Sequence, residues 1–171
     1  MEQRALDPTD LEVYMQENDI PGELLHLDVP TPTVAAAAQA VGTQPERIVK
    51  SMLFLVAGLP VLAITCGQTY VDRRALAAVY SVGRKKVKLA NPETVLKETG
   101  FEVGAMPPFG HHNPLPTWID ERVLEQSEVY AGGGAGNALV RLAPADILQA
   151  TQARVIDLSN PPGDKLNQEA S

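Results

Sequence analysis

Two consecutive apolar segments, residues 48–56 and 61–66, constrain the fold of this 171-residue chain more than any other feature. The four residues between them, 57–60, read Ala-Gly-Leu-Pro and have the composition of a turn, so the pattern predicts a β-hairpin. Both segments carry apolar residues at successive positions, whereas a strand with one solvated face would alternate. We therefore expect the hairpin to lie in the interior, with other elements covering both of its faces.

Helix and strand signals are interspersed on both sides of this hairpin. A helix is expected at 10–18, capped by Thr9 or Asp10, and another between Thr33 and Gly42. The Thr43-x-x-Glu46 spacing predicts a capping box and a short helical turn. Further helices are expected at 72–80, 91–100 and 144–150, and further strands at 24–29, 117–120, 128–131, 138–142 and 154–158.

These elements do not follow the strict alternation of a doubly wound sheet. We therefore expect a single α/β domain over residues 1–159, with a mixed and strongly curved sheet. The polar tail at 160–171 contains Pro-Pro-Gly and is expected to be disordered.

Composition excludes several classes of protein. The apolar run at 52–66 is interrupted by Gly58 and Pro60 and is shorter than the ~20 residues of a membrane helix. The N-terminal residues lack the basic and apolar regions of a signal peptide, and one cysteine is compatible with a reducing compartment, so we expect a cytoplasmic protein. A net charge of −7 disfavours non-specific coating of nucleic acid, but it leaves room for a local basic patch.

The segment Gly104-Ala-Met-Pro-Pro-Phe-Gly-His-His112 is predicted to be a rigid loop. Pro107 and Pro108 fix φ and favour extended backbone before them, while Gly104 and Gly110 supply conformational freedom on either side. A loop of preset shape can hold backbone N–H groups toward a substrate. The alternative is an ordinary structural turn.

Lys50 lies near the start of the first apolar strand. Its ammonium group either reaches solvent along the strand edge or meets a partner in a cleft, and structural lysines are the commoner case. A second candidate is the glycine-rich stretch 132–137, between two predicted strands. It is either an anion-binding nest of backbone N–H groups or a flexible hairpin loop.

The remaining candidate residues do not form a metal site or a nucleophile motif. His111 and His112 have no cysteine or carboxylate at ligand spacing, so no metal site is expected. Cys66 reads as a small buried apolar residue, and no serine lies in a Gly-x-Ser-x-Gly motif. In the basic run 84–89, the alternation predicts that Arg84, Lys86 and Lys88 share one side of a strand, either as a solvated face or as an RNA contact.

The motifs in their order along the chain resemble the YbaK/ProX family of aminoacyl-tRNA deacylases, which includes the editing domain of bacterial prolyl-tRNA synthetases. The resemblance spans residues 20–158. Each motif is weak alone, and the ordered set is specific. The motifs are Ile-Val-Lys-Ser at 48–51, Val-Lys-Leu-Ala-Asn-Pro-Glu at 87–93, Thr-Gly-Phe-Glu-Val-Gly at 99–104, Pro-Pro-Phe-Gly-His at 107–111 and Gly-Ala-Gly-Asn-Ala at 134–138.

The resemblance implies a mixed, barrel-like sheet flanked by helices, and hydrolysis of the ester that links a wrong amino acid to tRNA. No metal or other cofactor is implied. The catalytic positions would be Lys50 and Gly104. The substrate would be bound by Ala105, Met106, Pro107, Pro108, Phe109, Gly134 and Asn137, and tRNA by Arg84, Lys86 and Lys88.

A second hydrolytic site is needed because a synthetase pocket distinguishes side chains that differ by one methylene by only ~1–3 kcal/mol. We therefore expect a trans-editing deacylase for tRNA of proline charged with a small or medium wrong amino acid, with prolyl-tRNA synthetase as a possible partner. Two alternatives are a non-catalytic module that binds a synthetase or a tRNA end, and a small-molecule esterase.

Overall fold

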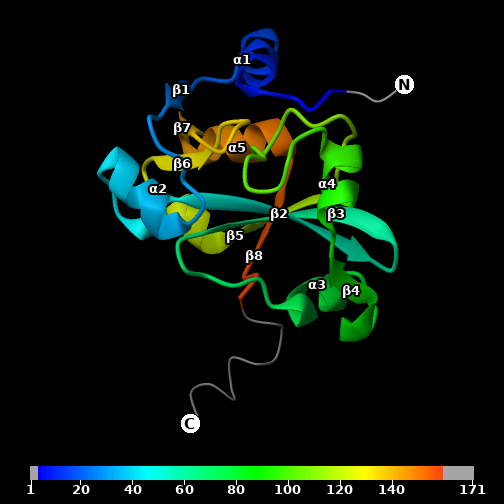
Figure 1. The fold of residues 1–171 in the computed structure, drawn as a ribbon. Helices are drawn as coiled ribbons and strands as arrows, with labels where there is room; N and C mark the ends of the chain where they lie inside the picture. The colour runs from blue at the N-terminus through cyan, green and yellow to red at the C-terminus, as the bar shows by residue number, and fades with distance from the viewer. Residues whose placement is uncertain (1–3, 160–171) are drawn as a thin grey trace.

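The structure, a computed structural model, describes residues 4–159 (Figure 1). Its helices are α1 (Pro8–Glu17), α2 (Val34–Val41), α3 (Arg73–Val79), α4 (Pro92–Thr99) and α5 (Pro144–Thr151). Short 3-10 turns are η1 (Pro45–Arg47), η2 (Arg84–Lys86) and η3 (Glu121–Glu125). The strands are β1 (Glu23–His26), β2 (Val49–Val56), β3 (Leu59–Cys66), β4 (Val87–Leu89), β5 (Thr117–Asp120), β6 (Val129–Gly132), β7 (Ala138–Leu142) and β8 (Arg154–Ile156). The tail predicted to be disordered lies outside the described residues.

The strands form two sheets in this part of the chain. One is antiparallel, in the order β1-β7-β6, and the other has the order β4-β2-β3-β5-β8. The larger sheet is mixed, because β2 is antiparallel to β3 and β4, whereas β5 is parallel to β3 and β8. A parallel bridge between Ile48 and Tyr130 connects the sheets. The predicted mixed α/β domain is confirmed, with two sheets in place of one barrel-like sheet.

The predicted hairpin is formed by β2 and β3, which pair from Val49 with Cys66 to Val56 with Leu59. Its turn consists of Ala57 and Gly58, with φ of 49° and 84°. Positive φ at both central residues matches the twist of a two-residue hairpin. The predicted four-residue turn is therefore wrong by two residues, since β3 begins at Leu59.

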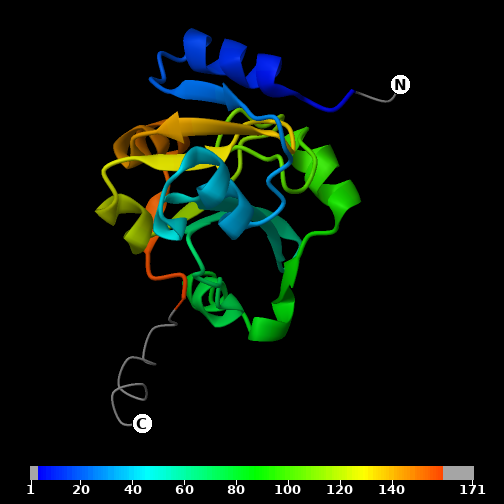
Figure 2. The same cartoon turned by 60° about the vertical axis from the view of Figure 1, so that its left-hand side comes forward.

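Both faces of the hairpin are covered, as predicted. Val49 and Leu53 on one face of β2 belong to the largest buried cluster. Phe54 and Val56, on the other face, pack with Leu76 of α3. Figure 2 shows the consequence for the molecule: α1 lies beyond the smaller sheet at one end, and α3 lies at the opposite end.

Several helices begin at the capping residues predicted from the sequence. The Thr33 hydroxyl accepts a hydrogen bond from the Ala36 N–H (3.0 Å), and α2 ends at Gly42 in the left-handed region. The Asn91 side chain caps α4 in the same way, and Asp72 caps α3. These signals are local, so they can be read from the sequence without knowledge of the tertiary fold.

The structure corrects two capping assignments. Helix α1 starts at Pro8, because Asp7 and Asp10 form a reciprocal capping box, so Thr9 and Asp10 lie inside the helix. The expected box at Thr43 is absent from the described structure, where η1 follows Gln44 without a side-chain cap. Pro45 occupies the first position of this turn and supplies the fixed φ there.

The basic run is also different from its prediction. Residues 84–86 form η2, and only 87–89 form a strand, so Arg84, Lys86 and Lys88 are not successive positions on one side of a strand. All three side chains are exposed. Strands β1, β6 and β8 differ from the predicted ranges by one to three residues at their ends.

Candidate active site

Lys50 projects from β2 on the same face as Met52 and Phe54, and its side chain is exposed. It lies at a cavity of about 240 Å³. This cavity, called the Lys50 cavity below, is lined by Lys50, Met52 and Phe54 of β2, by residues 68–71 of the loop after β3, and by Arg73 and Leu89. The lining therefore combines apolar residues, Met52, Phe54, Val71 and Leu89, with two cationic side chains, Lys50 and Arg73.

Two facing side chains of this strand pair, Lys50 and Thr65, have no hydrogen-bond partner among the described residues. Within residues 4–159 the Lys50 ammonium group has no ion pair or hydrogen bond. Thr65, which pairs with Lys50 in the hairpin, is fully buried, and its hydroxyl has no partner in the described structure. Buried polar groups without a partner are rare in folded proteins, so the Thr65 hydroxyl calls for an explanation such as a ligand or water, whereas the exposed Lys50 ammonium group is open to solvent.

The predicted rigid loop begins at Gly104, which has φ of 86°. Nothing lies within 4 Å of the position that a Cβ atom would occupy there, so glycine is required for its conformation and not for space. Residues 105–109 are all buried. The Ala105 N–H donates to the Glu102 carbonyl (3.1 Å), so this amide is already engaged within the protein.

The glycine-rich loop after β6 packs directly against this segment. The Gly134 N–H donates to the Ala105 carbonyl (2.8 Å), and a Cβ atom on Gly132 would lie 2.4 Å from the Met106 carbonyl oxygen. The Gly133 N–H donates to the Ala138 carbonyl (2.9 Å). The two loops, which are far apart in sequence, thus form one packed unit, and the Gly133 and Gly134 amides are engaged within it.

Asn137, at the end of the glycine-rich loop, is exposed and contacts a different segment. Its side-chain amide donates to the Leu27 carbonyl (3.3 Å), and its own carbonyl accepts from the Leu27 N–H (2.8 Å). Asn137 therefore holds the start of β7 against the chain that follows β1.

His111 fixes the exit of the Gly104 loop. Its Nε2 lies 2.8 Å from the Pro107 carbonyl oxygen, which can only accept, so the ring donates from Nε2. Burial lowers the pKa of His111 to about 4, and the hydrogen bond with Pro107 opposes this effect. The ring is consequently neutral at pH 7. The sequence set His111 aside as a metal ligand and placed it in the motif at 107–111, but it did not predict this structural role.

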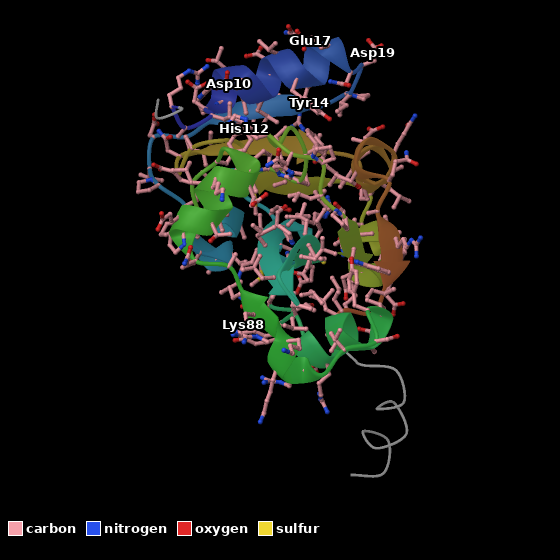
Figure 3. The ribbon with its side chains drawn as sticks, turned by 90° about the vertical axis from the view of Figure 1, so that its right-hand side faces the viewer. Asp10, Tyr14, Glu17, Asp19, Lys88 and His112 are labelled. Carbon is pink, nitrogen blue, oxygen red and sulfur yellow. The ribbon has the colours of Figure 1, made fainter. Side chains whose placement is uncertain are left out.

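The neighbouring residues of the loop are held by α1. The rings of Phe109 and Tyr14 stack with centroids 5.9 Å apart, and Gly110 leaves room for the Tyr14 ring, 3.4 Å from its missing Cβ position. Figure 3 shows Tyr14 on the face of α1 that points toward the body of the protein, with His112 close below the helix.

The structure brings the two glycine loops together and leaves Lys50 apart from them. Met106 and Phe109 pack in the same buried cluster as Val49 and Leu53, on the opposite face of β2 from Lys50. Among the described residues, the lining of the Lys50 cavity includes none from either loop. Gly104 is therefore not among the residues that line the Lys50 cavity, and the catalytic roles of Lys50 and Gly104 stay predictions.

Within residues 4–159, no group of three or more His, Cys, Asp or Glu side chains is placed to hold a metal ion. In the same part of the chain, none of the helices combines the length and the apolar character needed to cross a membrane.

Known proteins with similar sequences and structures identify the domain. The sequence profile of the aminoacyl-tRNA editing domain matches residues 28–150. The chain belongs to this family. A solved structure described as a candidate trans-editing enzyme for prolyl-tRNA synthetase resembles the editing domain with a TM-score of 0.83 and 33% identity, over 90% of this chain and 96% of that one. The family resemblance expected from the motifs is confirmed.

Two further relatives match a smaller share of the chain. The uncharacterized protein YwhH of Bacillus subtilis (strain 168) is 25% identical over 143 residues, which are 83% of this chain and 87% of YwhH. The multifunctional Ser/Thr-tRNA deacylase ProXp-y of Escherichia coli (strain K12) is 32% identical over 98 residues. That match covers 57% of this chain and 58% of ProXp-y.

The matched region contains Lys50 and both glycine loops, whereas α1 precedes it. Two residues of the editing domain that the sequence reading missed are Tyr70 and Arg73, which line the Lys50 cavity from the loop after β3 and from the start of α3. Charge distribution was a usable signal for Arg73, whereas no sequence pattern singles out Tyr70. Residues 50–88 hold seven of the fourteen Lys and Arg residues and one of the twenty-one Asp and Glu residues.

Proposed function

We propose that this editing domain is a trans-editing deacylase that acts on tRNA for proline charged with a small or medium wrong amino acid. The observation that supports it best is the unpaired Lys50 ammonium group at the Lys50 cavity, in a chain of the editing family. At about 240 Å³, the cavity is smaller than the ~300–1,000 Å³ of typical ligand pockets, which favours a small side chain.

The reaction needs little from the protein, because an aminoacyl ester is already reactive. The water oxygen bonds to the carbonyl carbon and loses a proton. The bond from this carbon to the ribose oxygen breaks, and the ribose oxygen takes up that proton. Negative charge develops on the carbonyl oxygen during this step. The Lys50 ammonium group offsets that charge or holds a phosphate of the tRNA end. Met52, Phe54 and Val71 provide the apolar wall for the amino-acid side chain.

The test is deacylation of tRNA for proline charged with Ala, Cys, Ser, Thr or Pro, together with a simple amino-acid ester. The wild type is expected to release a wrong amino acid and to spare Pro. Lys50→Ala is expected to lower the rate at least about ten- to a hundredfold, since a hydrogen bond to a charged group contributes roughly 1.5–3 kcal/mol. Lys50→Arg is expected to restore the rate only in part.

Lys97→Ala is the matched control, because Lys97 is an exposed lysine on α4 outside the cavity. Circular dichroism establishes that all variants are folded. A Lys50→Ala protein with the wild-type rate would show that this lysine is structural and would refute the assignment.

The separation of Lys50 from the glycine loops favours a second candidate function, a module that binds the tRNA end without hydrolysis. The same substrates distinguish the two. Tight binding of misacylated tRNA without release of amino acid supports the module, and hydrolysis of simple esters alone supports an esterase.

A further inference from the structure

A second, wider groove adjoins the Lys50 cavity. It has a volume of about 510 Å³ and is lined by residues 70–74, Arg84 and Ser159. Tyr70, Val71 and Arg73 line both spaces, so the groove opens into the cavity along the loop after β3. A ligand whose end occupies the Lys50 cavity can therefore continue into the groove past Tyr70.

Tyr70 is unusually exposed for an aromatic residue, at 85% of its full surface. Within residues 4–159 its ring stacks on no other ring and its hydroxyl has no hydrogen bond. The fold therefore gains little from a tyrosine here. An exposed ring beside a cationic groove is the arrangement on which nucleic-acid bases stack.

The groove is cationic although the whole protein is acidic. Its one carboxylate, Asp72, caps α3 and pairs with Arg74 (2.9 Å), and the Arg74 hydrogen bond holds the pKa of Asp72 below its usual range. Arg73 and Arg84 add two positive charges, and α3 packs against η2, which carries Arg84.

Charge is also segregated over the length of the molecule. Residues 1–28 contain eight Asp and Glu residues and one Arg. Figure 3 shows Asp10, Glu17 and Asp19 along or just after α1 at one end, and Lys88 at the opposite end. A polyanion is therefore attracted to the end that holds the groove and repelled from α1.

We propose that this groove binds the single-stranded 3′ end of the tRNA, with a base stacked on Tyr70 and phosphates held by Arg73 and Arg84. The proposal rests on the proposed function and extends it to the path of the nucleic acid. Stacking requires an unpaired base, which the 3′ end of an acceptor stem supplies and a duplex does not. An aromatic platform would contribute nothing to a polyanion without bases.

The test measures binding of a fluorescent single-stranded RNA that ends in CCA to the full chain, by anisotropy. Tyr70→Phe keeps the ring and is expected to bind like the wild type. Tyr70→Ala is expected to bind about 5- to 150-fold more weakly, which corresponds to about 1–3 kcal/mol per stacked base. Val29→Ala is the control, because Val29 is also exposed (55%) and lies outside the groove.

Charge reversal supplies an independent measurement. Arg73→Glu with Arg84→Glu is expected to lower the slope of log affinity against log salt, by roughly 0.7 for each lost contact with a single-strand phosphate. Equal binding of the RNA by wild type and Tyr70→Ala would overturn the stacking platform. Equal competition by a sulfated polysaccharide and by the RNA would likewise show a purely electrostatic surface and overturn it.

This design separates the two proposals. If the wild type binds the RNA through Tyr70 but hydrolyses no misacylated tRNA, the groove is supported and the deacylase is refuted. If the wild type hydrolyses misacylated tRNA and Tyr70→Ala changes neither binding nor rate, the groove is refuted while the deacylase stands.

Discussion

Asp120 is the residue whose replacement tests the packing of this domain most directly. Its carboxylate is fully buried and accepts hydrogen bonds from the Leu158 N–H (2.8 Å), the Arg122 N–H (3.0 Å) and the Arg122 guanidinium group (3.0 Å). Leu158 is itself fully buried, and its carbonyl accepts from the Asp72 N–H (2.7 Å). Asp120 therefore holds the segment after β8, which in turn holds the start of α3.

Asp120→Ala is expected to lower the free energy of unfolding by about 2–4 kcal/mol. The bond from the buried Leu158 N–H to a charged acceptor contributes roughly 1.5–3 kcal/mol of this. The ion pair with Arg122 adds less than about 1 kcal/mol, because the Arg122 side chain is 36% exposed and also pairs with Asp157. Asp120→Asn retains one acceptor oxygen and is expected to lose about half as much.

Urea unfolding followed by circular dichroism measures these differences, and hydrogen exchange reports the Asp72 amide. Exchange at Asp72 is expected to be faster in Asp120→Ala than in Asp157→Ala, whose ion pair is partly solvated. An Asp120→Ala protein within about 0.5 kcal/mol of the wild type would refute the reasoning, since that is the range of ordinary surface substitutions. Unchanged exchange at Asp72 would refute the connection to α3.

Two further predictions concern His111 and the basic run. Burial lowers the pKa of His111 to about 4 in the folded state, so the unfolded state binds more protons between pH 6.5 and pH 4. The free energy of unfolding is therefore expected to fall by up to about 3 kcal/mol as the pH is lowered through this range. His111→Gln, compared by urea unfolding at pH 7 and pH 4, should lose less on acidification; an identical pH dependence would contradict the assignment. Replacing Lys86 and Lys88 with Glu is expected to weaken tRNA binding and flatten its salt dependence, whereas Lys97→Glu should leave both unchanged. An unchanged salt slope would remove Lys86 and Lys88 from the interface.

The features that could be predicted from the sequence are those set by residues close together in the chain. Thr33, Asp72 and Asn91 cap helices wherever the helices lie, and the apolar hairpin is recognisable from its own composition. It did not predict the separation of Lys50 from the Gly104 loop, because that depends on which face of β2 each one meets.

The solvent exposure of individual side chains could not be predicted either, because it depends on which segments the fold brings together. The sequence alone made no prediction for Tyr70, because only the folded structure shows that its ring is in solvent. The burial of His111 beside Pro107 likewise depends on residues brought together by the fold.

The opposed faces of β2 have a consequence for how such domains change in length over evolution. The turn at Ala57 and Gly58 sets which residue of β2 meets which residue of β3. One residue gained or lost between Lys50 and that turn would rotate Lys50 to the face occupied by Met106 and Phe109, with every functional side chain still present in the sequence. Descendants of this chain can therefore accept odd-numbered insertions in their loops, but not within that stretch of strand.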